Sequence, residues 1–399
     1  MNAPGSVILD YTLHDLYAID NEGEEISLVY AYAPPPNTQP TSSTPALTRY
    51  PVQAPLCPAH GKEELAQILF HATAQRFGFF SGPMRIIVFD LDLDLDPDHG
   101  HATTIPRHHS DILEVFNQLP PHQRPLPIYT RHPQDLVLSP KSRLAVTVPL
   151  DWLTHLPHTI DPSAHYNLLS KRGLAESGLP TPRTIVIDTV LSPSHPFTDR
   201  DLHEEITRMT QPIRDHGLPF ILKVPRVTSI GQNTFIIRTK SDQTAVDTLF
   251  RDEVKSMLLE LTPSNEHLRP CNLILQEMVT GDTVGLTFFV TKTGRALFNC
   301  CTRQEVDDAY RWSGGFISYN EQSALESHYR RTINTVAQFL HDKGYFGPAS
   351  VDVMTDENGT QLVVDLNVRI TGTYHLGARC GGILLGVGSS RLQPWRIGD

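Results

Sequence analysis

Short apolar runs separated by helical stretches organise the first 165 residues. The runs are candidate strands, at 6–11, 26–32, 84–95, 127–131 and 144–149. Apolar residues recur at helical spacing between some of them, at 63–76 and 112–118. Alternating strands and helices are typical of an open α/β layer, so the pattern predicts an N-terminal α/β domain over 1–165.

From residue 166 the apolar pattern predicts a second region of mixed helices and strands that extends to 376. Helical spacing recurs between 241 and 261 and between 325 and 340, and a shorter helical stretch at 167–177 ends before Gly178. The expected strands are listed in chain order: 184–188, 219–224, 234–239, 272–276, 283–291, 294–301 and 346–354. A glycine-rich tail follows at 377–399.

The most informative alternation lies at 361–373. One parity carries Asp365, Asn367 and Arg369, and the other carries apolar residues at 366, 368 and 370. In a β-strand the two parities face opposite sides, so one face packs and the other presents an acid, an amide and a guanidinium. Asp and Asn are depleted in strands, whereas a divalent cation takes oxygen ligands and Arg suits phosphate or carboxylate. The pattern predicts a metal and anion site, with a solvent-exposed strand face as the alternative.

The strand at 346–354 strengthens that interpretation, because the Asn-Gly pair at 358–359 predicts a hairpin turn. With positions 355 and 360 paired, Asp352 lies opposite position 363 and shares a face with Asp365 and Asn367. Any turn with an even number of residues keeps this parity. Diagonal neighbours lie roughly 7–8 Å apart, within reach of one or two bridging cations.

Composition and charge narrow the class of protein. A chain of 399 residues is long enough for two or three domains with ample core. A formal net charge of −11 argues against general binding to nucleic acid or anionic membranes. No apolar run reaches the ~20 residues of a membrane span, and the N-terminus has no signal-peptide pattern. The five cysteines lack CxxC spacing, so we expect buried free thiols in a reducing, cytoplasmic compartment.

The N-terminal half also holds stretches that carry little functional information. Residues 33–58 are rich in Pro, Ser and Thr, which predicts an exposed or partly disordered loop. Residues 90–98 alternate Asp with Leu, but Pro97 stands where an EF-hand loop starting at Asp92 needs glycine, so a solvated acidic face is favoured over a cation site. The nearby histidines lack a ligand spacing and are expected to be loop residues: His99, His101, His108 and His109.

Four features that suit a nucleotide follow in order along the second region. Lys171 lies on a helix, and Lys223 ends a strand before a loop of small residues that includes Ser229 and Gly231. Gln276–Val279 and the acid and amide hairpin complete the set. Each feature is weak alone, but two lysines, loop amides and cation ligands together fit a nucleoside triphosphate with Mg²⁺. There is no GxxxxGK[ST] and no strand-linked GxGxxG, which excludes a P-loop and a Rossmann site.

With these features in this order, the chain resembles the ATP-grasp superfamily over about residues 166–376. The resemblance implies an ATP-grasp domain of two α+β subdomains that clasp ATP, with Mg²⁺ or Mn²⁺ as the metal. The preceding open α/β domain is similar to the pre-ATP-grasp domain of fungal and actinobacterial secondary-metabolism ligases, including the pheganomycin-type peptide ligase. The tail after 377 lacks the helical continuation that the family leads us to expect.

The resemblance implies roles for individual residues on the nucleotide side. Lys171 and Lys223 match the two phosphate-binding lysines, and Ser229 and Gly231 fall in the flexible loop over the phosphates. The adenine hinge is matched by Gln276, Glu277 and Val279, with Glu277 as the partner of the adenine N6. Asp282 is a weaker match to the ribose contact, because that acid usually falls slightly later.

The resemblance also implies the metal ligands. Asp352, Asp365 and Asn367 match them, although Asp365 stands where Glu is commoner. Arg369 matches the arginine that stabilises the transferred phosphate or the substrate carboxylate.

The activity implied is ADP-forming ligation of a carboxylate to an amine through an acyl phosphate, with an amino acid or peptide as substrate. Arg303 and Arg311 are candidates to anchor a substrate carboxylate, with ordinary surface arginine as the alternative, and 312–316 is expected to be a substrate-side loop. Two other functions stay open at this point: a non-catalytic or truncated ATP-binding protein, and a kinase-like phosphotransferase.

Overall fold

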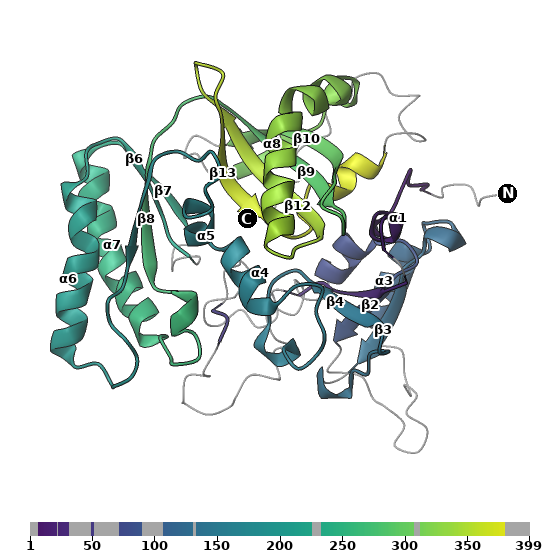
Figure 1. The fold of residues 1–399 in the computed structure, drawn as a ribbon, viewed down its shortest axis with the longest axis horizontal. Coiled ribbons are helices and arrows are strands. Elements are labelled where there is room, and N and C mark those ends of the chain that lie inside the picture. Colours follow the sequence, from purple (N-terminus) through teal and green to yellow (C-terminus); the bar gives the residue numbers. More distant parts are fainter. Residues whose placement is uncertain are drawn as a thin grey trace.

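Three β-sheets, each with its own helices, lie side by side along the long axis of the molecule (Figure 1). They are seen in a computed structural model, which describes these residues: 7–21, 23–31, 49–51, 72–89, 107–130, 133–225, 233–306 and 312–379. The sheets combine parallel and antiparallel pairing, so the predicted fold class, an open α/β region followed by two α+β units, is confirmed.

The N-terminal sheet has four parallel strands in the order β3-β2-β1-β4. They are β1 (Glu25–Val29), β2 (Arg85–Phe89), β3 (Leu126–Thr130) and β4 (Ser142–Val146). The described helices of this region are α1 (Leu13–Ala18), a helix at 72–78 and α3 (Arg107–Phe116). A parallel sheet needs crossover connections, which explains the alternation of apolar runs and helical stretches in the sequence.

The expected strand at 6–11 is not formed over its described part, residues 7–11. The amide of Leu9 donates to Gln123 Oε1 at 3.0 Å, and Gln123 Nε2 donates back to the Leu9 carbonyl at 2.7 Å. The Gln123 side chain therefore satisfies both backbone groups of Leu9 in place of a neighbouring strand. Sequence patterning sees only the apolar residues and cannot detect such a partner.

The small sheet is antiparallel, in the order β5-β8-β6-β7. Its strands are β5 (Thr184–Asp188), β6 (Phe220–Lys223), β7 (Thr234–Ile237) and β8 (Asn272–Glu277). The helices α6 (Asp199–Asp215) and α7 (Lys240–Leu259) pack on it, and each begins at a capping box, on Thr198 and Thr239 respectively. Its apolar core, which includes Phe220, Phe250 and Leu273, is separate from the rest of the buried interior.

The central sheet is also antiparallel, in the order β11-β10-β9-β12-β13. The strands are β9 (Asp282–Val290), β10 (Ala296–Val306), β11 (Trp312–Phe316), β12 (Gly347–Thr355) and β13 (Gln361–Asn367), with α8 (Gln322–Asp342) packed on β9 and β10. Residues of this sheet share one core with β1, β2 and β4 of the N-terminal sheet. The segment 312–316, expected to be a substrate-side loop, is instead the edge strand β11, because it pairs with β10.

The helical stretch predicted at 167–177 is two helices, α4 (Pro162–Leu169) and α5 (Lys171–Ala175). Ser170 separates them with an extended backbone, and its Oγ accepts from the amide of Gly173 at 2.7 Å. A Cβ at Gly173 would lie 1.9 Å from the carbonyl oxygen of Asn167, so this tight junction requires glycine. The break places Lys171 on the first turn of α5.

Short 3₁₀ helices complete the described structure: Pro121–Gln123, Pro133–Asp135, Asp151–Leu153, Glu266–Leu268, Tyr319–Glu321 and Tyr374–Arg379. Most of the Pro-rich stretch 33–58, the acidic stretch 90–98, His99, His101 and the tail from 380 lie outside the described residues. Cys271, Cys300 and Cys301 are buried and free, as expected of them. Among the described residues, no helix combines the length and apolarity that a bilayer span requires.

Candidate active site

A cavity of about 710 Å³ lies between the small sheet and the central sheet. Its size falls in the ~300–1,000 Å³ range of small-molecule sites. One side is formed by β6, β7 and β8 with the segment 278–281, and the other by β12, β13 and α5. The cavity therefore lies where the two antiparallel sheets face each other.

Two carboxylates meet on the central-sheet side, because Asp352 of β12 lies directly opposite Asp365 of β13. The predicted register, which set Asp352 against residue 363, is wrong. Residue 355 pairs with 361, so the turn is odd in length and by itself would turn Asp365 to the other face. A β-bulge restores the parity, because Val364 has no partner on β12. The prediction that Asp352 and Asp365 share a face is therefore correct, although the even turn and regular ladder on which it was based are not found.

The bulge also supplies backbone groups to neighbouring elements. The carbonyl oxygen of Val364 accepts a hydrogen bond from Lys223 Nζ at 2.6 Å, and the amide of Val363 donates to the carbonyl of Pro180 at 2.7 Å. β13 is the edge of the central sheet, so these groups would otherwise lack a partner strand. The irregular pairing joins β13 to the small-sheet side of the cavity.

Two lysines reach this pair of carboxylates from different elements. Lys171 Nζ forms an ion pair with Asp365 Oδ1, and Lys223 lies at the end of β6. Lys223 is only 8% exposed, and burial lowers its pKa to about 8, although the charge of Asp365 acts in the opposite direction. Both ammonium groups therefore face the same acid side chains.

The pKa values of the two carboxylates are shifted in opposite directions. Burial, and then the charge of Asp365, raise the pKa of Asp352 above its ordinary range. Burial also acts to raise the pKa of Asp365, but Lys171 and Lys223 outweigh it and lower that pKa. Two like charges in one buried site cannot both ionise freely, and the lysines decide which carboxylate keeps its charge.

The small-sheet side offers a surface suited to a flat ring. Gln276, Glu277 and Val279 line the cavity, as does Ile221 of β6. Gln276 is 5% exposed, and its Nε2 donates to Thr184 Oγ1 at 3.1 Å. The side chain of Glu277 is exposed at the end of β8. Across the cavity, Met354 of β12 adds a further apolar wall.

Several predicted residues are not brought into this cavity or are not described. Arg303 is exposed on β10, where its guanidinium lies 5.9 Å from the ring of Phe316 and 3.5 Å from Glu321. Asp282 is exposed at the start of β9 and does not line the cavity. The remaining candidates lie outside the described residues: Ser229, Gly231 and Arg311.

Among the lining residues that the sequence analysis did not select, three bear on the chemistry, and two of them carry a signal in the sequence. Ile221 and Met354 lie two positions from Lys223 and Asp352 on the same strands, so the two-residue period of a strand places them on the same face. Gln304 of β10 also lines the cavity, and its Nε2 donates to Asp352 Oδ1 at 2.6 Å. No local pattern connects Gln304 to Asp352, because another strand lies between them.

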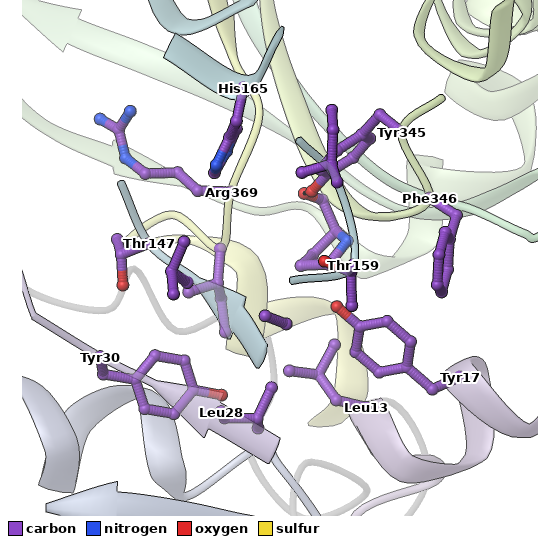
Figure 2. A pocket seen from close by; sticks show the side chains of 15 residues that line it. Leu13, Tyr17, Leu28, Tyr30, Thr147, Thr159, His165, Tyr345, Phe346 and Arg369 are labelled. Carbon is purple, nitrogen blue, oxygen red and sulfur yellow. Dashed lines mark hydrogen bonds between the residues drawn. The ribbon is translucent and has the colours of Figure 1, made fainter. Parts of the chain in front are cut away.

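A second cavity, of about 30 Å³, lies between the N-terminal sheet and the central sheet. Figure 2 shows His165 and Arg369 side by side on its wall, with Tyr17, Tyr30 and Tyr345 around it. Arg369 lines both cavities, and in Figure 2 its guanidinium points away from Tyr17 and Tyr345. This residue joins the two cavities at the end of β13.

His165 is held in this smaller cavity in its neutral form. Its Nε2 lies 2.8 Å from the carbonyl oxygen of Val368 and must donate to it, which leaves Nδ1 as an acceptor. Burial lowers the pKa of His165 to about 4, and Nδ1 has no partner among the described residues. The cavity thus presents a buried acceptor nitrogen next to Arg369.

The comparisons with known proteins identify the domain. Residues 221–373 match the family model of the ATP-grasp domain ATP-grasp_3. Residues 221–373 are therefore similar to an ATP-grasp domain, and the resemblance that the motifs indicated is confirmed over this range. A search of the curated proteins finds no match.

The solved structures that match the chain include three proteins of low identity. The L-amino acid ligase from Bacillus licheniformis is 11% identical, with a TM-score of 0.46, over 88% of this chain and 70% of that chain. N5-carboxyaminoimidazole synthetase from Staphylococcus aureus is 12% identical, with a TM-score of 0.45, over 90% and 77%. VanG D-Ala:D-Ser ligase from Enterococcus faecalis is 14% identical, with a TM-score of 0.37, over 56% and 58%, so this chain spans little more than half of that protein.

Proposed function

We propose that the protein is an ATP- and Mg²⁺-dependent carboxylate–amine ligase that works through an acyl phosphate. The observation that carries this proposal is the pair of opposed carboxylates, Asp352 and Asp365, at one end of the large cavity, with Lys171 paired to Asp365 and Lys223 bonded to the Val364 carbonyl between them. The family match over 221–373 supports ATP as the nucleotide.

The residues present fit a divalent cation. Asp352 and Asp365 offer carboxylate oxygens, and Asn367, which also lines the cavity, offers an amide oxygen. Within the described part of the chain, no group of three or more His, Cys, Asp or Glu residues suits a metal, so phosphate oxygens would complete the coordination. When bound, Mg²⁺ neutralises charge on the β- and γ-phosphates.

The lysines and the apolar walls account for the nucleotide. Lys171 pairs with Asp365 in this structure, and we propose that it transfers to a phosphate when the cation takes that carboxylate. Lys223 is proposed to hold a second phosphate. Ile221 and Met354 are placed to enclose the adenine, with Gln276, Glu277 and Val279 along its edge.

We propose the following reaction at this site. A carboxylate oxygen of the substrate attacks the γ-phosphorus of ATP, and ADP leaves. The amine nitrogen then attacks the acyl carbon, loses a proton, and phosphate leaves as the amide forms. Arg369 is proposed to stabilise the charge that develops on the acyl oxygen, because it lies between the nucleotide cavity and the smaller cavity.

The smaller cavity offers a second candidate site for a substrate group, next to Arg369. Its volume exceeds the ~10–15 Å³ that one water needs, so it admits a group of a few heavy atoms. The Nδ1 of His165 accepts but does not donate, which suits an amine or another donor beside Arg369. We propose that this cavity receives one end of the amino acid or peptide substrates, in cytoplasmic small-molecule or peptide biosynthesis.

The test is an incubation with ATP, Mg²⁺ and pooled amino acids, with ADP measured and hydroxylamine added to trap activated acyl groups. A ligase forms ADP only with substrate present and yields a hydroxamate. ADP formation without hydroxamate in the presence of hydroxyl compounds would instead identify a kinase-like phosphotransferase. ATP binding without ADP formation across the pools would identify a non-catalytic ATP-binding protein.

A further inference from the structure

An amide side chain reaches Asp352 from two strands away. Gln304 lies on β10 and Asp352 on β12, and β9 runs between them in the central sheet. Even so, Gln304 Nε2 donates to Asp352 Oδ1 at 2.6 Å. Both side chains line the large cavity, so this hydrogen bond crosses the floor of the candidate metal site.

Glycine on the intervening strand makes that contact geometrically feasible. Gly285 of β9 pairs with Asp352 on one side and with Thr302 on the other, so it lies beneath the Gln304 side chain. A Cβ at this position would be 3.2 Å from Gln304 Nε2, 3.6 Å from Asp352 Oδ1 and 3.0 Å from Thr302 Oγ1. A Cβ here would be in tight contact with the Gln304 amide and with Thr302 Oγ1, so these groups would have to shift by a few tenths of an ångström.

The two carboxylates are held by partners of different charge. Asp365 pairs with the Lys171 cation, which an incoming metal ion must displace. Asp352 is held by a neutral amide, which orients the carboxylate without neutralising its charge.

We propose that Gln304 is a positioning residue of the metal site, which fixes the rotamer of Asp352 for the cation, and that Gly285 is required to let it do so. This inference rests on the proposed function, since it presumes that Asp352 is a ligand. Side chains that orient metal ligands typically contribute about 10- to 100-fold in metal affinity. The sequence alone carries no trace of this pair, because Gly285 and Gln304 are 19 positions apart on neighbouring strands.

The test measures how tightly Mn²⁺ binds to the full chain in the presence of a non-hydrolysable ATP analogue. The concentration of free Mn²⁺ is read from its electron paramagnetic resonance signal. Gln304→Met keeps the length of the side chain and removes the amide, so Mn²⁺ affinity should fall by about 10- to 100-fold. Binding of the analogue in EDTA and the melting temperature of the free protein should stay near wild type. Gln338→Met is the matched control, because it removes a 2.7 Å Gln-to-Asp hydrogen bond on the surface of α8.

Gly285→Ala tests whether the Gln304 variant loses Mn²⁺ affinity because Asp352 is no longer oriented, or because the fold around the site is disturbed. It should weaken Mn²⁺ binding in the wild-type background and add little in the Gln304→Met background, because the amide that it displaces is already absent. If Gln304→Met does not fold, Gln304→Asn replaces it, since its amide is one methylene too short to reach Asp352.

Each outcome bears on a distinct claim. If the Gln304 variant binds Mn²⁺ with wild-type affinity, the positioning role is overturned and the ligase proposal stands. If the losses of Mn²⁺ affinity in the double variant are fully additive, the result is the same. If the wild-type protein binds the analogue but no Mn²⁺, the metal site itself is wrong and the proposed function fails with it.

Discussion

Replacing Lys223 by Met tests the nucleotide site where its geometry is best defined. Met keeps the apolar stem and removes the ammonium that donates to the carbonyl of Val364 at 2.6 Å. Lys223 is 8% exposed, and burial lowers its pKa to about 8. At pH 7 the ammonium form is therefore still the major one, despite the cost of burying its charge. A triphosphate next to this ammonium would gain a charge-assisted hydrogen bond.

The expected loss of affinity follows from the value of one such contact. A hydrogen bond to a charged group contributes about 1–3 kcal/mol, which corresponds to roughly a 5- to 150-fold increase in the Kd for Mg-ATP. Stability should change little, because two terms oppose each other. The carbonyl of Val364 loses its donor, while the unfavourable burial of an ammonium is removed.

Isothermal titration with Mg-ATP measures the affinity, and thermal unfolding without ligand measures the stability. Lys240→Met is the matched control, because Lys240 is exposed on α7, outside the cavity, and donates only to Gln243. The control should bind Mg-ATP as the wild-type protein does. If Lys223→Met also binds with the wild-type Kd, Lys223 does not contact a phosphate and the orientation proposed for the nucleotide is wrong.

Three further substitutions test other parts of the argument. Asp365→Asn should unfold near the wild-type temperature without ligand, lose the stabilisation by Mg-ATP and form ADP at least about tenfold more slowly, since each ~1.4 kcal/mol of lost charge stabilisation is a factor of ten. Met354→Trp should fill the part of the cavity proposed to hold adenine and should therefore weaken ATP binding. An unchanged Kd for ATP would contradict this prediction. Burial lowers the pKa of His165 from 6.5 to about 4, so the unfolded chain takes up the proton first as the pH falls. The stability that neutral His165 contributes is complete above about pH 6.5 and lost toward pH 4, so the advantage of wild type over His165→Gln should shrink by about 2 kcal/mol between pH 7.5 and 5 in urea unfolding. An advantage that stays constant over this range would contradict the prediction.

The elements of the ATP-grasp region could be predicted because their signals are local. The two-residue period defines β5 at Thr184–Asp188, the boundaries found in the structure. The 3.6-residue period predicts α7 and α8; in the structure α7 begins after the N-cap Thr239, and Gly344, with a φ of +81°, follows the end of α8. A predicted boundary was wrong where one side chain interrupts an element. The single helical stretch expected at 167–177 is divided at Ser170 into α4 and α5.

Part of the candidate site could be predicted from the sequence. The two-residue period of a strand shows which residues share a face, but not which of the two faces points toward the cavity. Lys223, Asp352 and Asn367 line the cavity because their strands direct those faces toward it. Arg303 was selected for its charge, yet it faces away on β10 while its neighbour Gln304 lines the cavity. Choosing between adjacent residues requires the partner strands, and β11 was not recognised as a strand.

The β12–β13 hairpin shows why a correct site can follow from an incorrect register. Sequence parity assumed an even turn and a regular ladder, whereas the turn is odd and Val364 forms a bulge. Each irregularity alone would turn Asp365 away from Asp352, and together they restore the shared face. The bulge has a second effect that a regular ladder would lack, because it frees the Val364 carbonyl to hold Lys223 beside the carboxylates.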